Sequence, residues 1–135
     1  MDSKNLDASP RTITFLIALS IFFTYAVARI LFLFMDQHYI PSLTLHISNI
    51  HIHHFVYGIF LLAIIGYIAL FIRKKVYIYC AAIFYGIGIG LAFDEILMWV
   101  RLNGKHSELV SLCTISGISL IFFLISLFLP EKKRS

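Results

Sequence analysis

Charged residues are scarce in this sequence and make up only 13% of its 135 residues. A water-soluble domain carries roughly 25% charged residues and about 45–50% apolar residues. Because 60% of the residues here are hydrophobic, the chain has too few polar side chains to cover a globule in water. Intrinsic disorder is excluded as well, since disordered chains have low hydrophobicity. The composition therefore indicates an integral membrane protein.

Cysteine is also scarce, with only Cys80 and Cys113 present. We expect them near opposite ends of two membrane spans, much farther apart than the roughly 7 Å between Cα atoms that a disulfide allows. An intramolecular disulfide and a dithiol redox role are therefore not expected. Both cysteines are interpreted as small residues of the helix packing.

Four apolar stretches are each long enough for a spanning helix, which needs about 20 mostly apolar residues. They cover residues 12–35, 54–72, 76–100 and 109–129. The connections are short, so we predict one all-α membrane domain over 1–135 with four transmembrane helices. The first apolar run continues past Ala26-Val27-Ala28, which favours a retained span over a cleaved signal peptide.

The basic residues predict the orientation of these spans. Arg101 and Lys105 fall on one side of the membrane, and eight others fall on the opposite side: Lys4, Arg11, Arg73, Lys74, Lys75, Lys132, Lys133 and Arg134. The positive-inside rule then places both termini in the cytoplasm, with the inner or plasma membrane expected if the source is bacterial. Anionic lipid and topology account for these short basic clusters, so a nucleic-acid partner is not expected.

Three ionisable residues, Arg29, Asp94 and Glu95, lie well inside predicted spans. Arg29 and Asp94 each precede the outer end of a span by six residues, which places both roughly 9 Å below the outer interface. Because isolated charges in a membrane are costly, we expect the two to pair. One interpretation is a clamp that only fixes helix packing. Since that clamp leaves Glu95 unexplained, a bound cation is the other interpretation.

Small residues recur every four positions in the second and third spans, a spacing that lets helices approach closely. In the third span, one face carries Ala82, Gly86, Gly90 and Asp94, and an adjacent stripe carries Gly88, Ala92 and Glu95. The stripe in the second span is His54, Gly58, Leu62 and Gly66. We expect these two spans to pack through the stripes, which would bring His54 toward Asp94 and Glu95.

The segment before the second span alternates apolar and polar residues, the period of a β-strand. Ser48-Asn49 interrupts the alternation with turn residues, so residues 43–53 can form a hairpin on the outer face. In that hairpin Ile47 faces Ile50, His46 faces His51, and Thr44 faces His53. If the helix instead begins early, His51 and His54 align on one helical face. Both geometries gather imidazoles.

The clustered histidines are candidate metal ligands, because imidazole is the commonest side-chain ligand for metals. The predicted ligand set is His51, His53, His54, Asp94 and Glu95. These nitrogen and oxygen donors suit Zn²⁺, Fe²⁺, Cu²⁺ or Mn²⁺, with zinc or iron favoured, and argue against an iron–sulfur cluster. The alternative is that the histidines are ordinary polar residues at a membrane interface.

The string His51-Ile-His-His-Phe-Val-Tyr-Gly58, followed by Gly88-Ile-Gly-Leu-Ala-Phe-Asp-Glu95, resembles a group of small bacterial integral membrane proteins of uncharacterised function. Those proteins also pair an H-x-H-H motif that opens one span with a glycine-rich span ending in Asp-Glu. The likeness covers about a third of the chain, in the second and third spans. It implies that the two motifs belong together, and it carries no activity over to this sequence.

These features leave several functions open. The first is a membrane metal protein. If it is an enzyme, we expect hydrolysis or transfer on a lipid-like substrate, in which the metal activates water. Glu95 or Asp94 would then be the general base, and Arg29 would hold a phosphate or oxyanion. The second is a non-enzymatic subunit or homo-oligomer that uses the Arg29–Asp94 clamp. Channel and transporter functions are less favoured, because the cytoplasmic halves of the spans are nearly uncharged. Haem ligation by His54 and another outer histidine is also less favoured and would require a coloured protein.

Overall fold

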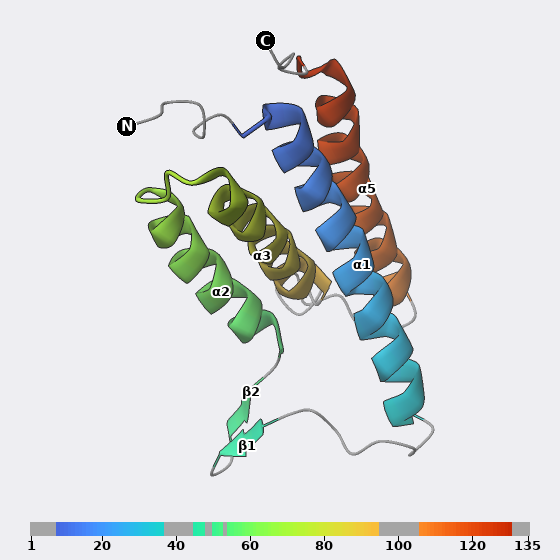
Figure 1. Ribbon diagram of the computed structural model, residues 1–135. Helices are drawn as coiled ribbons and strands as arrows, with labels where there is room; N and C mark the ends of the chain where they lie inside the picture. The colour runs from blue at the N-terminus through green and yellow to red at the C-terminus, as the bar shows by residue number, and fades with distance from the viewer. Residues whose placement is uncertain (1–7, 37–44, 48–49, 53, 95–105, 131–135) are drawn as a thin grey trace.

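The computed structural model describes residues 8–36, 45–47, 50–52, 54–94 and 106–130 of the chain. These residues form four helices and one pair of short strands (Figure 1). The elements are α1 (Pro10–Asp36), β1 (Leu45–Ile47), β2 (Ile50–Ile52), α2 (His54–Ala69), α3 (Lys75–Asp94) and α5 (His106–Phe128).

The helices agree with the four predicted apolar stretches in place and order, with shifts at their ends. The helix α2 ends at Ala69 rather than at residue 72, because the chain tightens into a turn. Its last bonds are of the i→i−3 type: the Leu70 amide donates to the Tyr67 carbonyl at 3.2 Å and the Phe71 amide to the Ile68 carbonyl at 3.0 Å. The helix α5 begins at His106, ahead of the predicted residue 109. The predicted end of the third span at residue 100 lies outside the described residues.

Each helix packs mainly against its neighbours in the order α2–α3–α1–α5 (Figure 1). The helices α1 and α3 run in the same direction, and α2 and α5 run in the opposite direction. The start of α1, the α2–α3 turn and the end of α5 therefore lie at one end of the molecule. The strands β1 and β2 lie at the other end.

The hydrophobic core lies where α1, α3 and α5 meet, and its buried side chains are Ile21, Tyr25, Ile89 and Ile115. A hydrogen bond also joins two of these helices, because the Ser119 hydroxyl donates to the Ala18 carbonyl at 2.9 Å. Hydroxyl groups commonly link apolar helices in this way, since the helix interior offers few other partners. The core thus holds α1 between α3 and α5.

Glycines set how closely α3 approaches the helices on both of its sides. A Cβ atom built on Gly86 would lie 2.7 Å from the Ile17 carbonyl oxygen of α1, and one on Gly90 would lie 3.2 Å from the Ile21 oxygen. On the other side of α3, a Cβ atom on Gly58 of α2 would lie 2.5 Å from the Ala92 amide nitrogen. The contacts at Gly86 and Gly58 are too short for any larger residue without a shift of backbone, and the contact at Gly90 requires a smaller adjustment.

These contacts confirm that α2 and α3 pack through small residues, and they correct which stripe of α3 is used. The face of α3 that carries Gly86, Gly90 and Asp94 packs on α1, and the expectation that it meets α2 is wrong. The adjacent stripe packs on α2 instead, with Gly88 opposite Leu62. Residues two positions apart on a helix point roughly 160° apart, so α3 can present one stripe to each neighbour.

The outer surface of the helices is strongly apolar. Large side chains such as Phe60 (64% exposed), Tyr67 (66%) and Phe128 (86%) face outward on α2 and α5. Two helical segments, Pro10–Leu31 and Lys75–Asp94, are long and apolar enough to cross a membrane, and two shorter apolar segments are Phe55–Ala69 and Leu112–Phe128. Such extensive apolar exposure indicates a lipid or protein environment rather than water.

The strands β1 and β2 pair in antiparallel orientation. Their register places His46 opposite His51 and Ile47 opposite Ile50, the same two pairs that the alternating pattern predicts. The predicted turn at Ser48-Asn49 and the third pair, Thr44 with His53, lie outside the described residues. The complete hairpin over 43–53 therefore stays a prediction.

Candidate functional site

The clearest polar feature inside the helices is an ion pair between Arg29 of α1 and Asp94 of α3. The Arg29 Nη2 atom lies 3.2 Å from the Asp94 Oδ1 atom. The Asp94 side chain is 8% exposed and the Arg29 side chain is 28% exposed. The two residues predicted to pair at matched depth therefore do pair, and the carboxylate is the more deeply buried partner.

The position of this pair follows from the glycine packing of α1 on α3. Gly86 meets Ile17 and Ser20, and one turn later Gly90 meets Ile21 and Thr24. Because the two helices run in the same direction, each step of four residues on α3 matches a step of about four on α1. The next step on α3 is Asp94, and the pair with Arg29 continues the series.

Tyr25 is part of this site and was not identified from the sequence. The centre of the Arg29 guanidinium group lies 5.2 Å from the centroid of the Tyr25 ring, within the range of a cation–π interaction. Tyr25 is 8% exposed, so the ring replaces water around the cation. The signal was available, since Tyr25 precedes Arg29 by four residues and therefore shares its helical face.

The structure tests little of the predicted metal-ligand set. His53 and Glu95 lie outside the described residues, and His51 and His54 are placed through their backbone alone. Asp94 has a described side chain, and it contacts Arg29. Within the described part of the chain, no three His, Cys, Asp or Glu side chains gather into a group that could hold a metal ion.

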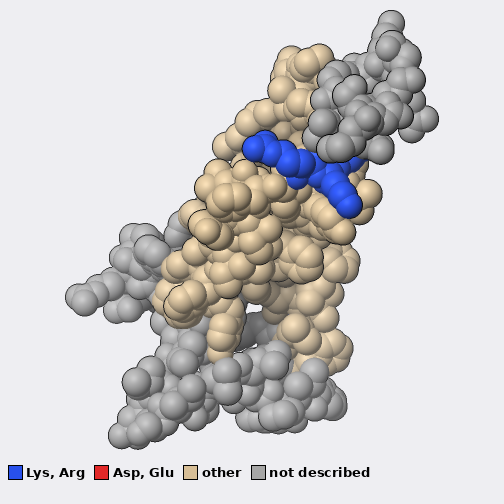
Figure 2. Space-filling view, turned by 60° about the vertical axis from the view of Figure 1, so that its left-hand side comes forward, with Lys and Arg blue, Asp and Glu red and all other residues tan. Residues whose placement is uncertain are grey.

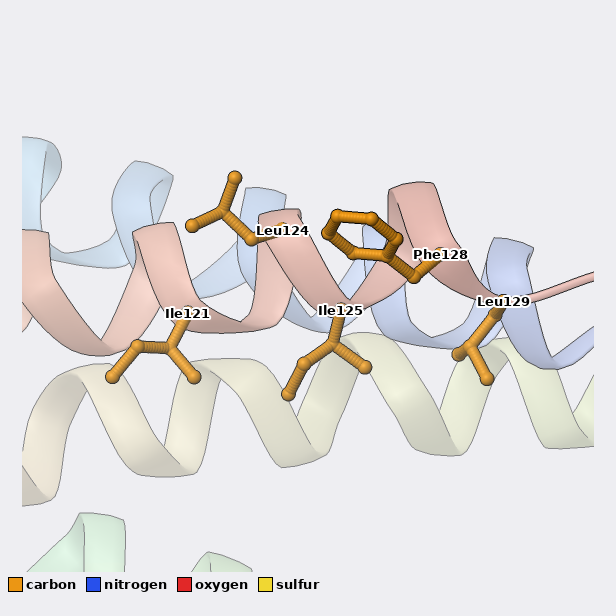
Figure 3. A pocket seen from close by; sticks show the side chains of 5 residues that line it. All are labelled: Ile121, Leu124, Ile125, Phe128 and Leu129. Atoms are coloured by element: carbon orange, nitrogen blue, oxygen red, sulfur yellow. The ribbon is translucent and has the colours of Figure 1, made fainter.

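A shallow hollow of about 350 Å³ lies along the second half of α5 (Figure 3). Its lining consists of Ile121, Leu124, Ile125, Phe128 and Leu129. Four of the side chains come from α5 and Leu129 directly follows it. None of the five carries a polar atom, so they offer no general acid, base or metal ligand. The hollow suits a hydrocarbon chain and not a catalytic site.

In the part of the chain that the structure describes, the fold and the site thus define a layer of apolar helices with a buried ion pair between α1 and α3. Comparisons with protein-family models, with curated proteins and with solved structures found no match.

Proposed function

We propose that this chain is an integral membrane protein with four spanning helices and that its histidine-rich end binds a divalent transition metal. The membrane placement is supported by the two helical segments that are long and apolar enough to span and by the exposed aromatic side chains around them. The orientation follows from the basic residues, with both termini in the cytoplasm and the histidines outside. The resemblance to small bacterial membrane proteins stays a prediction.

One observation carries the metal proposal, namely the register that pairs His46 with His51. Residues directly opposite each other in an antiparallel pair have Cβ atoms about 4.5–5.5 Å apart on the same face of the sheet. Two imidazoles at such positions can share one metal ion. The second helix begins at His54, two residues after β2 ends, so further histidine ligands follow at once in the chain. Zinc and iron are the metals that we favour for this donor set.

The ion pair changes the role that we propose for Asp94. Its carboxylate is held against Arg29 inside the α1–α3 contact, so we assign Asp94 to positioning the helices beneath the metal. Glu95 is then the better candidate for a general base in metal-assisted hydrolysis or transfer. The Arg29 side chain, 28% exposed, could also contact a phosphate or oxyanion of a lipid-like substrate.

Metal content measured by mass spectrometry on detergent-purified protein tests this proposal. We expect about one metal ion per chain in the unmodified protein and loss of most of it in the His46→Ala/His51→Ala variant. The matched control is Ile47→Ala, which changes the same strand without removing a ligand and should keep the metal. A metal content well below one per chain in the unmodified protein would refute the proposal.

A second candidate function is a non-enzymatic membrane subunit or homo-oligomer in which Arg29 and Asp94 act as a packing clamp. The observation that favours it is the continuity of the ion pair with the glycine contacts of α1 and α3. The Glu95→Gln variant separates the two candidates. If the variant loses metal but still assembles, a metal site is supported. If the unmodified protein binds no metal and the variant fails to assemble, the packing clamp is supported.

A further inference from the structure

The turn between α2 and α3 forms a surface that is basic at its centre. Arg73, Lys74 and Lys75 are consecutive and exposed, and Figure 2 shows lysine and arginine side chains gathered together at one end of the molecule. Two of these cations lie near aromatic rings: the Lys74 Nζ atom is 5.9 Å from the centroid of Tyr77, and the Lys75 Nζ atom is 5.7 Å from that of Tyr79. These contacts hold both ammonium groups close to α3.

The start of α1 is attached to the same surface. The backbone amide of Ser9 donates a hydrogen bond to the Tyr79 hydroxyl at 3.3 Å. The first turns of α1 and α3 contain no acidic residue, although the positive end of a helix dipole favours one. The one carboxylate with a described side chain, Asp94, lies at the opposite end of α3. Positive charge therefore accumulates here without a described counter-charge.

Apolar side chains border the basic residues on both sides in the sequence. Leu70 is 69% exposed and Phe71 is 66% exposed before them, and Val76 is 67% exposed after them. A phosphate ion or a nucleic acid gains nothing from such a border. A phospholipid does, because its phosphate meets the cations while its acyl chains cover the neighbouring apolar surface.

We propose that Arg73, Lys74 and Lys75, together with their apolar border, bind the headgroup of an anionic phospholipid. The phosphate of the lipid supplies a negative charge that the first turns of α1 and α3 do not carry. The inference rests on the membrane placement proposed above and is independent of the metal. A protein that is extracted from membranes without metal would refute the metal proposal and leave this one standing.

Native mass spectrometry of the full chain in neutral detergent, titrated with phosphatidylglycerol or phosphatidylcholine, provides the test. We expect the unmodified protein to retain phosphatidylglycerol in preference to phosphatidylcholine. In the Lys74→Gln/Lys75→Gln variant, its affinity for phosphatidylglycerol should fall roughly 25-fold, since each lysine near an anionic lipid contributes about fivefold. Added salt should weaken binding to the unmodified protein, because these charges are exposed.

The matched control is Arg101→Gln/Lys105→Gln, which removes the same charge from the segment between the third and fourth spans and should leave the affinity unchanged. Thermal unfolding of each variant checks that it is folded. Equal loss of phosphatidylglycerol in both variants would overturn the proposal, because binding would then depend on net charge alone. Inorganic phosphate that binds as tightly as the lipid would overturn the assignment to a lipid.

Discussion

At the scale of single residues, Arg29 and Asp94 each lower the free-energy cost of placing the other's charge among apolar helices. A lone charge at the centre of a membrane costs about 2.5–3.5 kcal/mol on insertion scales, and a charge nearer the interface costs less. The contact of 3.2 Å between the two side chains and the Tyr25 ring beside the guanidinium group reduce that cost. This pair was predictable from the sequence, because two opposite charges in apolar helices at equal depth have few other partners.

The Asp94→Asn variant should be less stable than the unmodified protein by about 2 kcal/mol, because it leaves the Arg29 cation without its carboxylate. This value is below that for a fully buried pair, since the Arg29 side chain is 28% exposed. The Arg29→Met/Asp94→Leu variant removes both charges and should recover most of the lost stability. Unfolding in detergent, followed by circular dichroism, measures both effects. A double variant as unstable as the single one would contradict the role of the pair as a packing clamp.

At the scale of helices, the small-residue stripes of α3 show which part of the helix packing the sequence does not predict. The sequence correctly indicated that α3 packs closely on its neighbours, since glycine recurs along it. It could not indicate which stripe meets which helix, because α2 and α3 are apolar on all sides and no polar face marks the outside. A helix side that carries glycines also has no side chains there that would favour one neighbouring helix over another. Which helix lies against each side of α3 depends on how all four helices are arranged, with α1 on one side and α2 on the other.

Two glycines of α2 provide a matched pair of substitutions. A Cβ atom on Gly58 would lie 2.8 Å from the Gly88 carbonyl oxygen, whereas a Cβ atom on Gly66 would have no atom within 4 Å. Gly58→Ala should therefore separate α2 from α3 and destabilise the protein by about 1–3 kcal/mol. Gly66→Ala should be neutral or stabilising by up to about 1 kcal/mol, because alanine favours helix. Thermal unfolding in one detergent compares them, and equal effects would show that α2 does not pack at Gly58.

At the scale of the whole molecule, the two ends differ in character. One end carries the basic turn of Arg73, Lys74 and Lys75, and the other carries the strands with His46 and His51 (Figure 1). The sequence predicted both ends from charge and histidine positions alone. It predicted the strand register as well, because a one-residue slip would move the isoleucines to the histidine face. The arrangement around the histidines was less predictable, since two geometries fitted the same pattern.

The difference between the ends predicts how the chain is accessible from the two sides of a membrane. The test first replaces Cys80 and Cys113 by serine. A single cysteine is then introduced, either as Ile72→Cys in the basic turn or as Asn49→Cys in the predicted hairpin. A membrane-impermeant maleimide added to intact cells should label the Asn49→Cys variant. It should label the Ile72→Cys variant only after the membrane is permeabilised, because the proposed orientation places the basic turn in the cytoplasm. Labelling of both variants in intact cells would contradict the proposed orientation. Labelling of the Ile72→Cys variant alone would place the histidines inside, where the metal site would face the reducing cytoplasm.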